Sequence, residues 1–108
     1  MLAEIRKLPV VFDSSATSNA VSVGNYTIVG LEIGSGFNGT AITIDAASTE
    51  GGTYYSVYDT AGAELSLTVA ASRHIAIPPI TIPGARFVKL TSGSSEDMTI
   101  NLLARPIQ

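Results

Sequence analysis

The chain has 108 residues, of which 45% are hydrophobic and only 14% are charged, and its formal net charge is -3. This length predicts one domain with its own core, and the charged fraction is below the roughly 25% that is typical of soluble domains. The acidic balance does not provide the basic footprint of nucleic-acid-binding proteins, and the absence of Cys excludes disulfides and thiolate metal sites.

The N-terminal residues do not have the pattern of a secretory signal. Glu4, Arg6 and Lys7 lie where the apolar centre of such a signal would be. No apolar run approaches the roughly 20 residues that a membrane-spanning helix needs. We therefore expect a soluble chain that is made in the cytoplasm and binds neither membranes nor nucleic acid.

Residues 1–19 differ from the remainder of the chain. Charged residues and Pro9 are followed by the polar stretch 13–19. This segment is either a first strand plus a loop or an extended arm that lies on a neighbouring subunit. Residues 20–108 are predicted to form a β-sandwich, so that the whole chain is a single domain.

Apolar and polar residues alternate with a period of two in most of the remaining segments. Residues 41–46 show this most clearly, and in 27–33 the alternation directs Val29, Leu31 and Ile33 inward. Such alternation is typical of antiparallel strands with one buried and one solvent-exposed face. The full set of predicted strands, in chain order, is 8–12, 20–23, 27–33, 41–46, 53–58, 65–69, 73–77, 86–91 and 98–102.

The connections between these strands carry turn residues. Pro78-Pro79 and Pro83-Gly84 predict a sheet edge or a crossing between sheets, because proline cannot donate to a central ladder. Residues 92–97 are predicted to be a solvated loop. Short strands separated by such turns indicate an all-β, antiparallel β-sandwich of about eight strands.

The alternation also predicts which side chains form the core. The predicted core residues are Val10, Val21, Val23, Val29, Leu31, Ile33, Ile42, Ile44, Tyr55, Val57, Leu67, Val69, Ile75, Ile77, Val88, Leu90, Ile100 and Leu102.

Residues 34–39 match the pattern G-x-G-x-x-G and follow a predicted strand. A dinucleotide site requires a helix next, so that the helix N-terminus can face the pyrophosphate. The alternation after residue 39 instead indicates a strand. We therefore interpret residues 34–39 as a glycine-rich hairpin loop.

No set of residues matches a catalytic constellation. His74 is the only histidine, its predicted position faces away from the core, and no nucleophile motif accompanies it. Loop acids near Asp45, Glu50 or Asp97 leave a Ca²⁺ site as an alternative. The sequence therefore predicts a protein that is not an enzyme, with no cofactor and no catalytic or metal residues.

Tyr54, Tyr55 and Tyr58 form the one aromatic cluster. On a strand, Tyr54 and Tyr58 share a face, whereas Tyr55 joins Val57 on the opposite face and is predicted to be core. Tyr54 and Tyr58 are either a cross-strand packing pair or a contact platform for a partner or a sugar ring.

Three stretches together resemble a known family. Residues 44–54, Ile-Asp-Ala-Ala-Ser-Thr-Glu-Gly-Gly-Thr-Tyr, resemble the hairpin of discoidin-like jelly rolls, and residues 84–90, Gly-Ala-Arg-Phe-Val-Lys-Leu, resemble their late strand. Residues 29–33 occupy the place of an early sheet strand. The same elements are similar to those of head decoration (cement) and other virion-associated proteins of tailed bacteriophages. The resemblance covers about residues 20–105 and implies a jelly-roll-like fold.

The resemblance also implies a role. It suggests a structural protein on the capsid surface of a phage virion, made in the cytoplasm of the bacterial host, with the major capsid protein as partner and a homo-oligomeric state, a trimer being favoured. The alternative is a carbohydrate-binding or host-recognition module on a tail or fibre. The candidate partner-interface residues are Leu2, Ile5, Arg6, Lys7, Leu8, Val10, Ile80, Ile82, Tyr54 and Tyr58.

Overall fold

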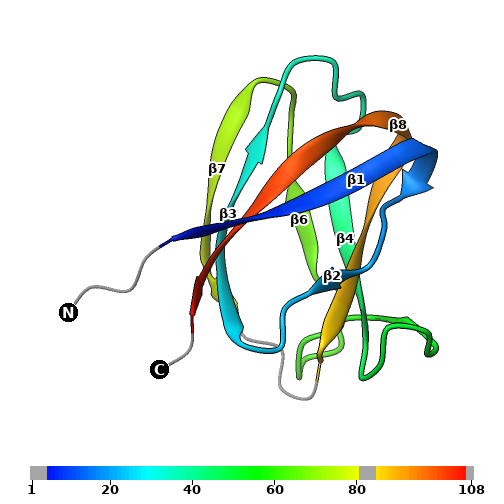
Figure 1. The fold of residues 1–108 in the computed structure, drawn as a ribbon, viewed down its shortest axis with the longest axis vertical. Helices are drawn as coiled ribbons and strands as arrows, with labels where there is room; N and C mark the ends of the chain where they lie inside the picture. Colours follow the sequence, from blue (N-terminus) through cyan, green and yellow to red (C-terminus); the bar gives the residue numbers. More distant parts are fainter. Residues whose placement is uncertain (1–4, 81–84, 107–108) are drawn as a thin grey trace.

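The structure is a computed structural model that describes residues 5–80 and 85–106, and these residues form one curled antiparallel sheet (Figure 1). The order along the sheet is β5-β4-β8-β3-β7, with β1 and β2 also paired to β8 and β6 paired to β4. The all-β, antiparallel prediction is confirmed. The strands are β1 (Arg6–Thr17), β2 (Val21–Ser22), β3 (Tyr26–Ile33), β4 (Ala41–Ala47), β5 (Tyr55–Ser56), β6 (Ser66–Thr68), β7 (Arg73–Ile80) and β8 (Phe87–Pro106).

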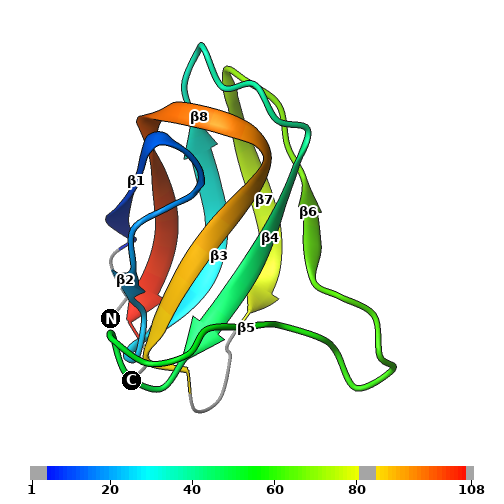
Figure 2. The same cartoon turned by 90° about the vertical axis from the view of Figure 1, so that its right-hand side faces the viewer.

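Strand β8 is long and bent, and it organises the rest of the sheet. Residues 87–92 pair with β4, whereas residues 101–106 pair with β3 on the same side of the strand. In Figures 1 and 2, β8 accordingly passes from one half of the curled sheet to the other. The prediction of two strands separated by a solvated loop at 92–97 is wrong, because the chain continues as a strand through this bend.

A buried polar network explains why the polar residues of the bend are ordered. Glu96 is 1% exposed. Its Oε1 accepts hydrogen bonds from the backbone N and the side-chain Nδ2 of Asn38, at 2.8 and 3.2 Å. Its Oε2 accepts from the backbone N of Gly39 at 2.8 Å and from Ser92 Oγ at 2.7 Å. Since a buried polar group is tolerated only when it is hydrogen-bonded, this network fixes the bend.

The β3–β4 connection is the other half of this corner. Strand β4 pairs with the first part of β8 and β3 pairs with its last part, and the two strands do not pair with each other. Residues 34–40, which connect them, therefore cross between the two halves of the sheet. The interpretation as a hairpin loop is therefore wrong, although the connection does lead into a strand. A Cβ at Gly39 would collide with Ser92 Oγ, so the close approach of this loop to β8 requires glycine here.

The N-terminal segment follows β8 along its other side. Strand β1 pairs with β8 from Arg6 opposite Ala104 to Phe12 opposite Met98, and β2 pairs with the beginning of β8. Between them, Ser18 donates its backbone N to the carbonyl of Leu90 and accepts the Leu90 N–H on its Oγ, both at 2.9 Å. From Arg6 onward, the segment is thus a first strand that belongs to the sheet of its own chain.

A β-bulge in β3 alters the predicted alternation. The register against β8 shifts between Ile28 and Gly30, which leaves Val29 as the extra residue. Ile28 is buried as a result, while Val29 is only half-buried, so the inward assignment of Val29 is wrong.

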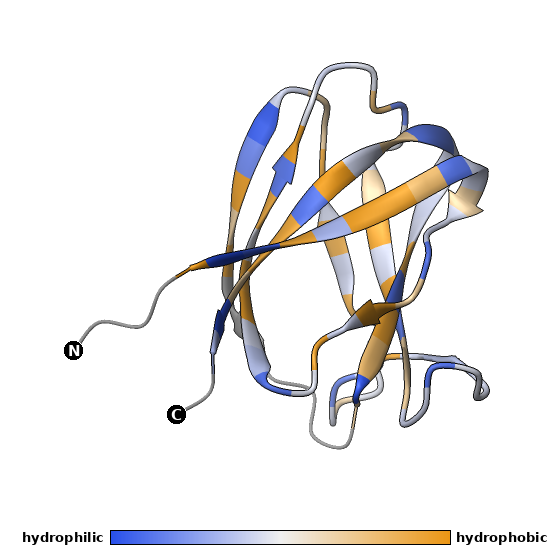
Figure 3. Cartoon of the chain, in the orientation of Figure 1, coloured by the Kyte–Doolittle hydropathy of each residue, from blue (hydrophilic) through white to orange (hydrophobic). Residues whose placement is uncertain are grey.

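The core lies inside the curl of the sheet and contains most of the predicted residues. Figure 3 shows the apolar residues alternating along β1 and β8. Phe12, Ile28 and Phe37 are buried core residues that the alternation did not identify, and the Phe12 and Phe37 rings meet edge to face with centroids 6.0 Å apart. The predicted core residues that are buried are Val10, Val21, Val23, Leu31, Ile33, Ile42, Ile44, Val69, Ile77, Val88, Leu90, Ile100 and Leu102. The half-buried ones that pack against the core are Val57, Leu67 and Ile75.

Candidate functional site

Strand β1 presents an exposed apolar row. Alternation along the strand turns Leu8 and Val10 inward, and Val10 is fully buried. Val10 therefore contacts its own core and cannot also contact a partner, so its place among the interface residues is wrong. Ile5 and Val11 are 54% and 40% exposed, and the exposed Pro9 lies between them on the same face. These three residues, with Lys7, form what we call the β1 row.

The free edge of β1 is closed to further strand pairing. The backbone N of Val11 donates to Asn19 Oδ1 at 2.8 Å, and its carbonyl accepts from the backbone N of Asn19 at 3.0 Å. Val11 thus directs its backbone N–H and C=O away from β8. In an antiparallel pair these groups point toward and away from the partner strand in alternate residues, so the backbone of Pro9, two residues earlier, also faces away from β8. A proline on this edge has no N–H to offer an incoming strand. The β1 row can therefore bind a partner through side chains and not by adding a strand.

A polar cluster on the outer face of the sheet includes Lys7 of the β1 row. Lys7 Nζ is 3.3 Å from Glu32 Oε1, and Asn101 Nδ2 donates to the same oxygen at 3.1 Å. The hydrogen bond from Lys7, followed by that from Asn101, lowers the pKa of Glu32 below its ordinary value of 4.5. His74 lies opposite Glu32 in the register and adds a smaller lowering effect.

We expect this cluster to make the free energy of unfolding depend on pH. The pKa of Glu32 is lower in the folded chain than in the unfolded chain. The stabilisation is therefore fully present at a pH above the unfolded-state pKa, and it is lost as the pH falls through the folded-state pKa. A carbon-detected NMR titration should give a Glu32 midpoint below 4.5, and Lys7→Met should raise that midpoint. A midpoint that does not move in Lys7→Met would contradict the assignment to the Lys7 ammonium.

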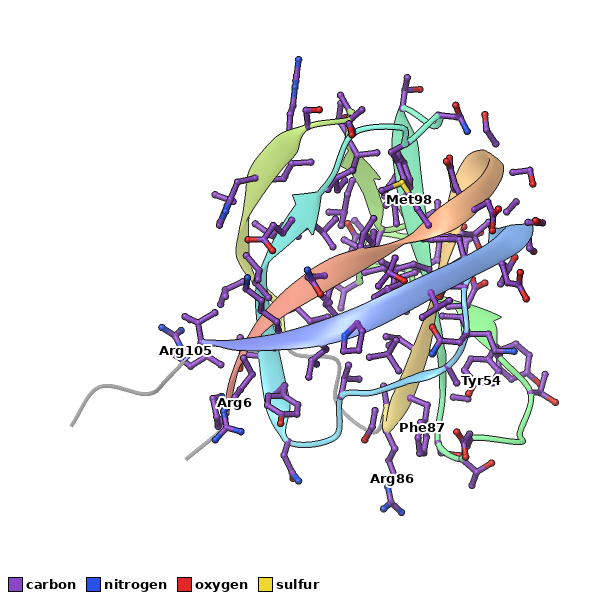
Figure 4. The ribbon with its side chains drawn as sticks, turned by 45° about the horizontal axis from the view of Figure 1, so that its top comes forward. Arg6, Tyr54, Arg86, Phe87, Met98 and Arg105 are labelled. Atoms are coloured by element: carbon purple, nitrogen blue, oxygen red, sulfur yellow. The ribbon has the colours of Figure 1, made fainter. Side chains whose placement is uncertain are left out.

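The aromatic cluster lies at the opposite end of β4 from the corner. Tyr54 and Phe87 lie at this end of the molecule (Figure 4). Tyr55 is 71% exposed, so its assignment to the core is wrong. The reason is its position: β5 is a two-residue strand at the edge of the sheet, and it pairs only with β4. Tyr55 therefore extends beyond the side chains that fill the curl.

Tyr54 is held in place by its neighbours. Its hydroxyl donates to the carbonyl of Glu50 at 2.8 Å, and Lys89 Nζ lies 4.5 Å from the centre of its ring. On the adjacent strand, Asp45 accepts hydrogen bonds from Ser56 Oγ at 3.1 Å and Thr91 Oγ1 at 3.4 Å. This surface is thus a set of hydroxyl groups with one carboxyl, one ammonium and one ordered aromatic ring.

Tyr58 lies at the base of a projecting loop. Figure 2 shows the chain between β5 and β6 extending away from the sheet. The tip is ordered by Asp59, whose Oδ1 accepts the backbone N–H groups of Ala61 and Ala63, each at 2.9 Å. Tyr58 forms an isolated bridge with Glu64 and is 59% exposed. Its ring is therefore available to a partner on an ordered support.

The predicted interface residues do not all come together. Arg6 and Lys7 are exposed on β1, and Ile5 is exposed just before it, whereas Tyr54 and Tyr58 belong to the separate surface beside β4. Ile80 ends β7, and its side chain lies outside the described part of the structure, as do Leu2 and Ile82.

The further chemical groups of the chain are its one histidine and its acidic residues. His74 is exposed on the edge strand β7. Within residues 5–80 and 85–106, no group of three His, Asp or Glu side chains could hold a metal ion. No helix in this described part is long and apolar enough to cross a membrane.

Besides Phe12 and Ile28 in the core, the residues that alternation missed lie at the corner. Asn38, Gly39, Ser92 and Glu96 are polar or small and come from segments that looked like loops. The sequence shows a glycine-rich segment at 34–39 and a polar segment with Glu96 at 92–97. Nothing in their local pattern indicates that these two segments contact each other. Comparisons with protein-family models, curated protein sequences and solved structures find no match.

Proposed function

We propose that this chain is a non-enzymatic virion structural protein, a decoration protein that binds the outer surface of a bacteriophage head through the major capsid protein. In this proposal the curled sheet is a jelly-roll-like β-sandwich, and the protein acts by binding alone. The observation that carries the proposal is the β1 row, an exposed apolar strip on an edge strand that is protected against strand addition.

The β1 row fits attachment to a preformed surface. Ile5 and Val11 are two of the four large hydrophobic residues that the described structure leaves exposed. Exposed apolar residues grouped on one face are typical of a binding surface, and here Lys7, which lies between Ile5 and Pro9 in the row, adds a charge that is paired with Glu32. Each copy would join neighbouring capsid subunits, so that opening the lattice must also break this interface.

Many symmetric copies would strengthen a modest contact. A standard interface buries about 1,600 Å², and repeated attachment on a lattice adds avidity without any new contact. The low charge of the chain, 14% of residues, is consistent with a surface that is partly covered by partners.

Substitution of the β1 row tests this proposal. We expect Ile5→Asp and Val11→Asp each to weaken binding to purified phage heads by roughly 10-fold or more, because an aspartate would be desolvated at the interface. Cosedimentation of the purified chain with heads that lack it measures the loss. Tyr58→Asp is the matched control, since it places the same charge at an exposed hydrophobic residue outside the β1 row.

The binding of these variants distinguishes the β1 row from the surface that carries Tyr58. Equal unfolding midpoints for all three variants would show that the fold is intact. If Ile5→Asp and Val11→Asp bind heads as well as the natural chain does, the assignment to the β1 row is wrong.

The second candidate is recognition of host glycans on a tail or fibre. The specific observation is the exposure of Tyr55 and Tyr58 beside the hydroxyl groups around Asp45, since aromatic rings and hydroxyl groups are the chemistry that binds sugars. Binding to host envelope glycans that is lost in Tyr58→Ala would favour this candidate over head attachment.

A further inference from the structure

Strand β7 is the outermost strand of its half of the sheet. It pairs with β3 and, within the described residues, with no other strand. In Figure 1, β7 accordingly lies at the margin of the molecule. Its second edge therefore carries backbone groups that no strand of the described chain satisfies.

The register identifies which backbone groups these are. The backbone N of Ser72 donates to the carbonyl of Gly34 at 3.1 Å, and the next pairs are Arg73 with Ile33 and His74 with Glu32. Because hydrogen-bonded and non-hydrogen-bonded pairs alternate in an antiparallel ladder, His74 and Ala76 bond to β3. It follows that Arg73 and Ile75 direct their N–H and C=O groups outward, and that Ile77, which comes just before the register with β3 shifts, directs its N–H outward.

The other edges of the sheet do not offer a long row of outward-facing backbone groups. The edge of β1 is occupied by Asn19 and interrupted by Pro9, while β2, β5 and β6 have only two or three residues each. Residues 73–77 contain neither Pro nor Lys, the residues that commonly protect a free edge. Pro78 and Pro79 follow in the same strand, so the unprotected stretch of the β7 edge ends at residue 77.

We propose that β7 pairs antiparallel with β7 of a second copy of this chain, with Ile75 on the two-fold axis. In this register Ile75 lies opposite Ile75 of the partner copy, Arg73 lies opposite Ile77, and His74 lies opposite Ala76. No like charges oppose each other. Ile75 is half-buried and packs against the core, so the pairing also covers its remaining exposed surface with apolar surface.

The symmetry of this contact fixes the oligomeric state. The same strand serves on both copies, so the interface is isologous and closes at two copies. The inference does not depend on attachment to a phage head, and it differs from the trimer that the resemblance to decoration proteins implies.

Two variants that differ only at residue 76 test the pairing. His74 and Ala76 are both exposed, so substitutions here spare the core. In His74→Lys/Ala76→Lys, each Lys at 74 opposes a Lys at 76 of the partner copy. In His74→Lys/Ala76→Glu, each Lys opposes a Glu, and Lys at 74 still faces Glu32 in its own chain.

Analytical ultracentrifugation of the full chain gives the readout. We expect the natural chain to be a dimer, the Lys/Lys variant to raise the dimer Kd by roughly 10-fold, and the Lys/Glu variant to bind at least as tightly as the natural chain. Hydrogen exchange should also show protection of the Arg73, Ile75 and Ile77 amides that decreases on dilution. A monomer at every concentration, a trimer, or equal Kd values for the two variants would overturn the proposal.

Discussion

Replacing Glu96 by Ala is expected to lower the free energy of unfolding by about 3–5 kcal/mol, because Glu96 is the buried charged residue of the described structure. The side chain is 1% exposed and accepts four hydrogen bonds through its two oxygens. Alanine would leave the backbone N–H groups of Asn38 and Gly39 and the hydroxyl of Ser92 without their acceptor. Each donor left unsatisfied in a buried position costs about 1–3 kcal/mol.

Equilibrium unfolding in urea measures this change, with Asp97→Ala as the matched control. Asp97 is the next residue of β8 and is exposed, so its substitution should change the stability by less than about 0.5 kcal/mol. Glu96→Gln should fall between the two, because it keeps one acceptor oxygen but presents an NH₂ group to a donor. If Glu96→Ala costs no more than Asp97→Ala, the buried network does not hold the corner.

Phe12→Ala is expected to cost about 3–5 kcal/mol as well, through the cavity left in the core. Phe12 is 1% exposed, and its ring meets the Phe37 ring edge to face. Phe37 belongs to the β3–β4 connection, so this contact joins β1 to the same corner that Glu96 holds. An aromatic pair of this geometry adds about 0.5–1.5 kcal/mol beyond its buried area.

Val11→Ala is the neighbouring control, since Val11 is exposed on the other face of β1. It should lower the stability by well under 1 kcal/mol. A double-mutant cycle with Phe37→Ala should give a coupling energy of about 0.5 kcal/mol or more, since the rings are in contact. Additive losses at Phe12 and Phe37 would mean that the rings contribute only their separate burial.

The strands that the sequence predicted well are those in which one face is buried along the whole length. In β4, Ile42 and Ile44 are fully buried while Thr43 and Asp45 lie on the outer face, as simple alternation requires. Pro78 and Pro79 were expected at a sheet edge, and β7 is an edge strand. Local pattern suffices where each residue's environment depends only on its side of the sheet.

The errors arise where tertiary contacts override that pattern. The bend of β8 looked like a loop because its residues are polar, but Glu96 and Ser92 are satisfied by a loop from a distant part of the sequence. The bulge at Val29 shifts the alternation of β3, so that Ile28 faces the core in place of Val29. Tyr55 lies on an edge strand beyond the core and is therefore exposed. The candidate site was predicted in part: the outward residues of β1 follow from alternation, but Val10 could not serve both core and partner.

The most direct test of the proposed role is the copy number of this chain in purified particles of a phage whose genome carries this sequence, measured by quantitative mass spectrometry against the major capsid protein. Attachment to the head lattice predicts hundreds of copies per particle. A handful of copies would place the chain on the tail or fibre and favour the tyrosine surface. Its absence from the particle would contradict a virion role altogether.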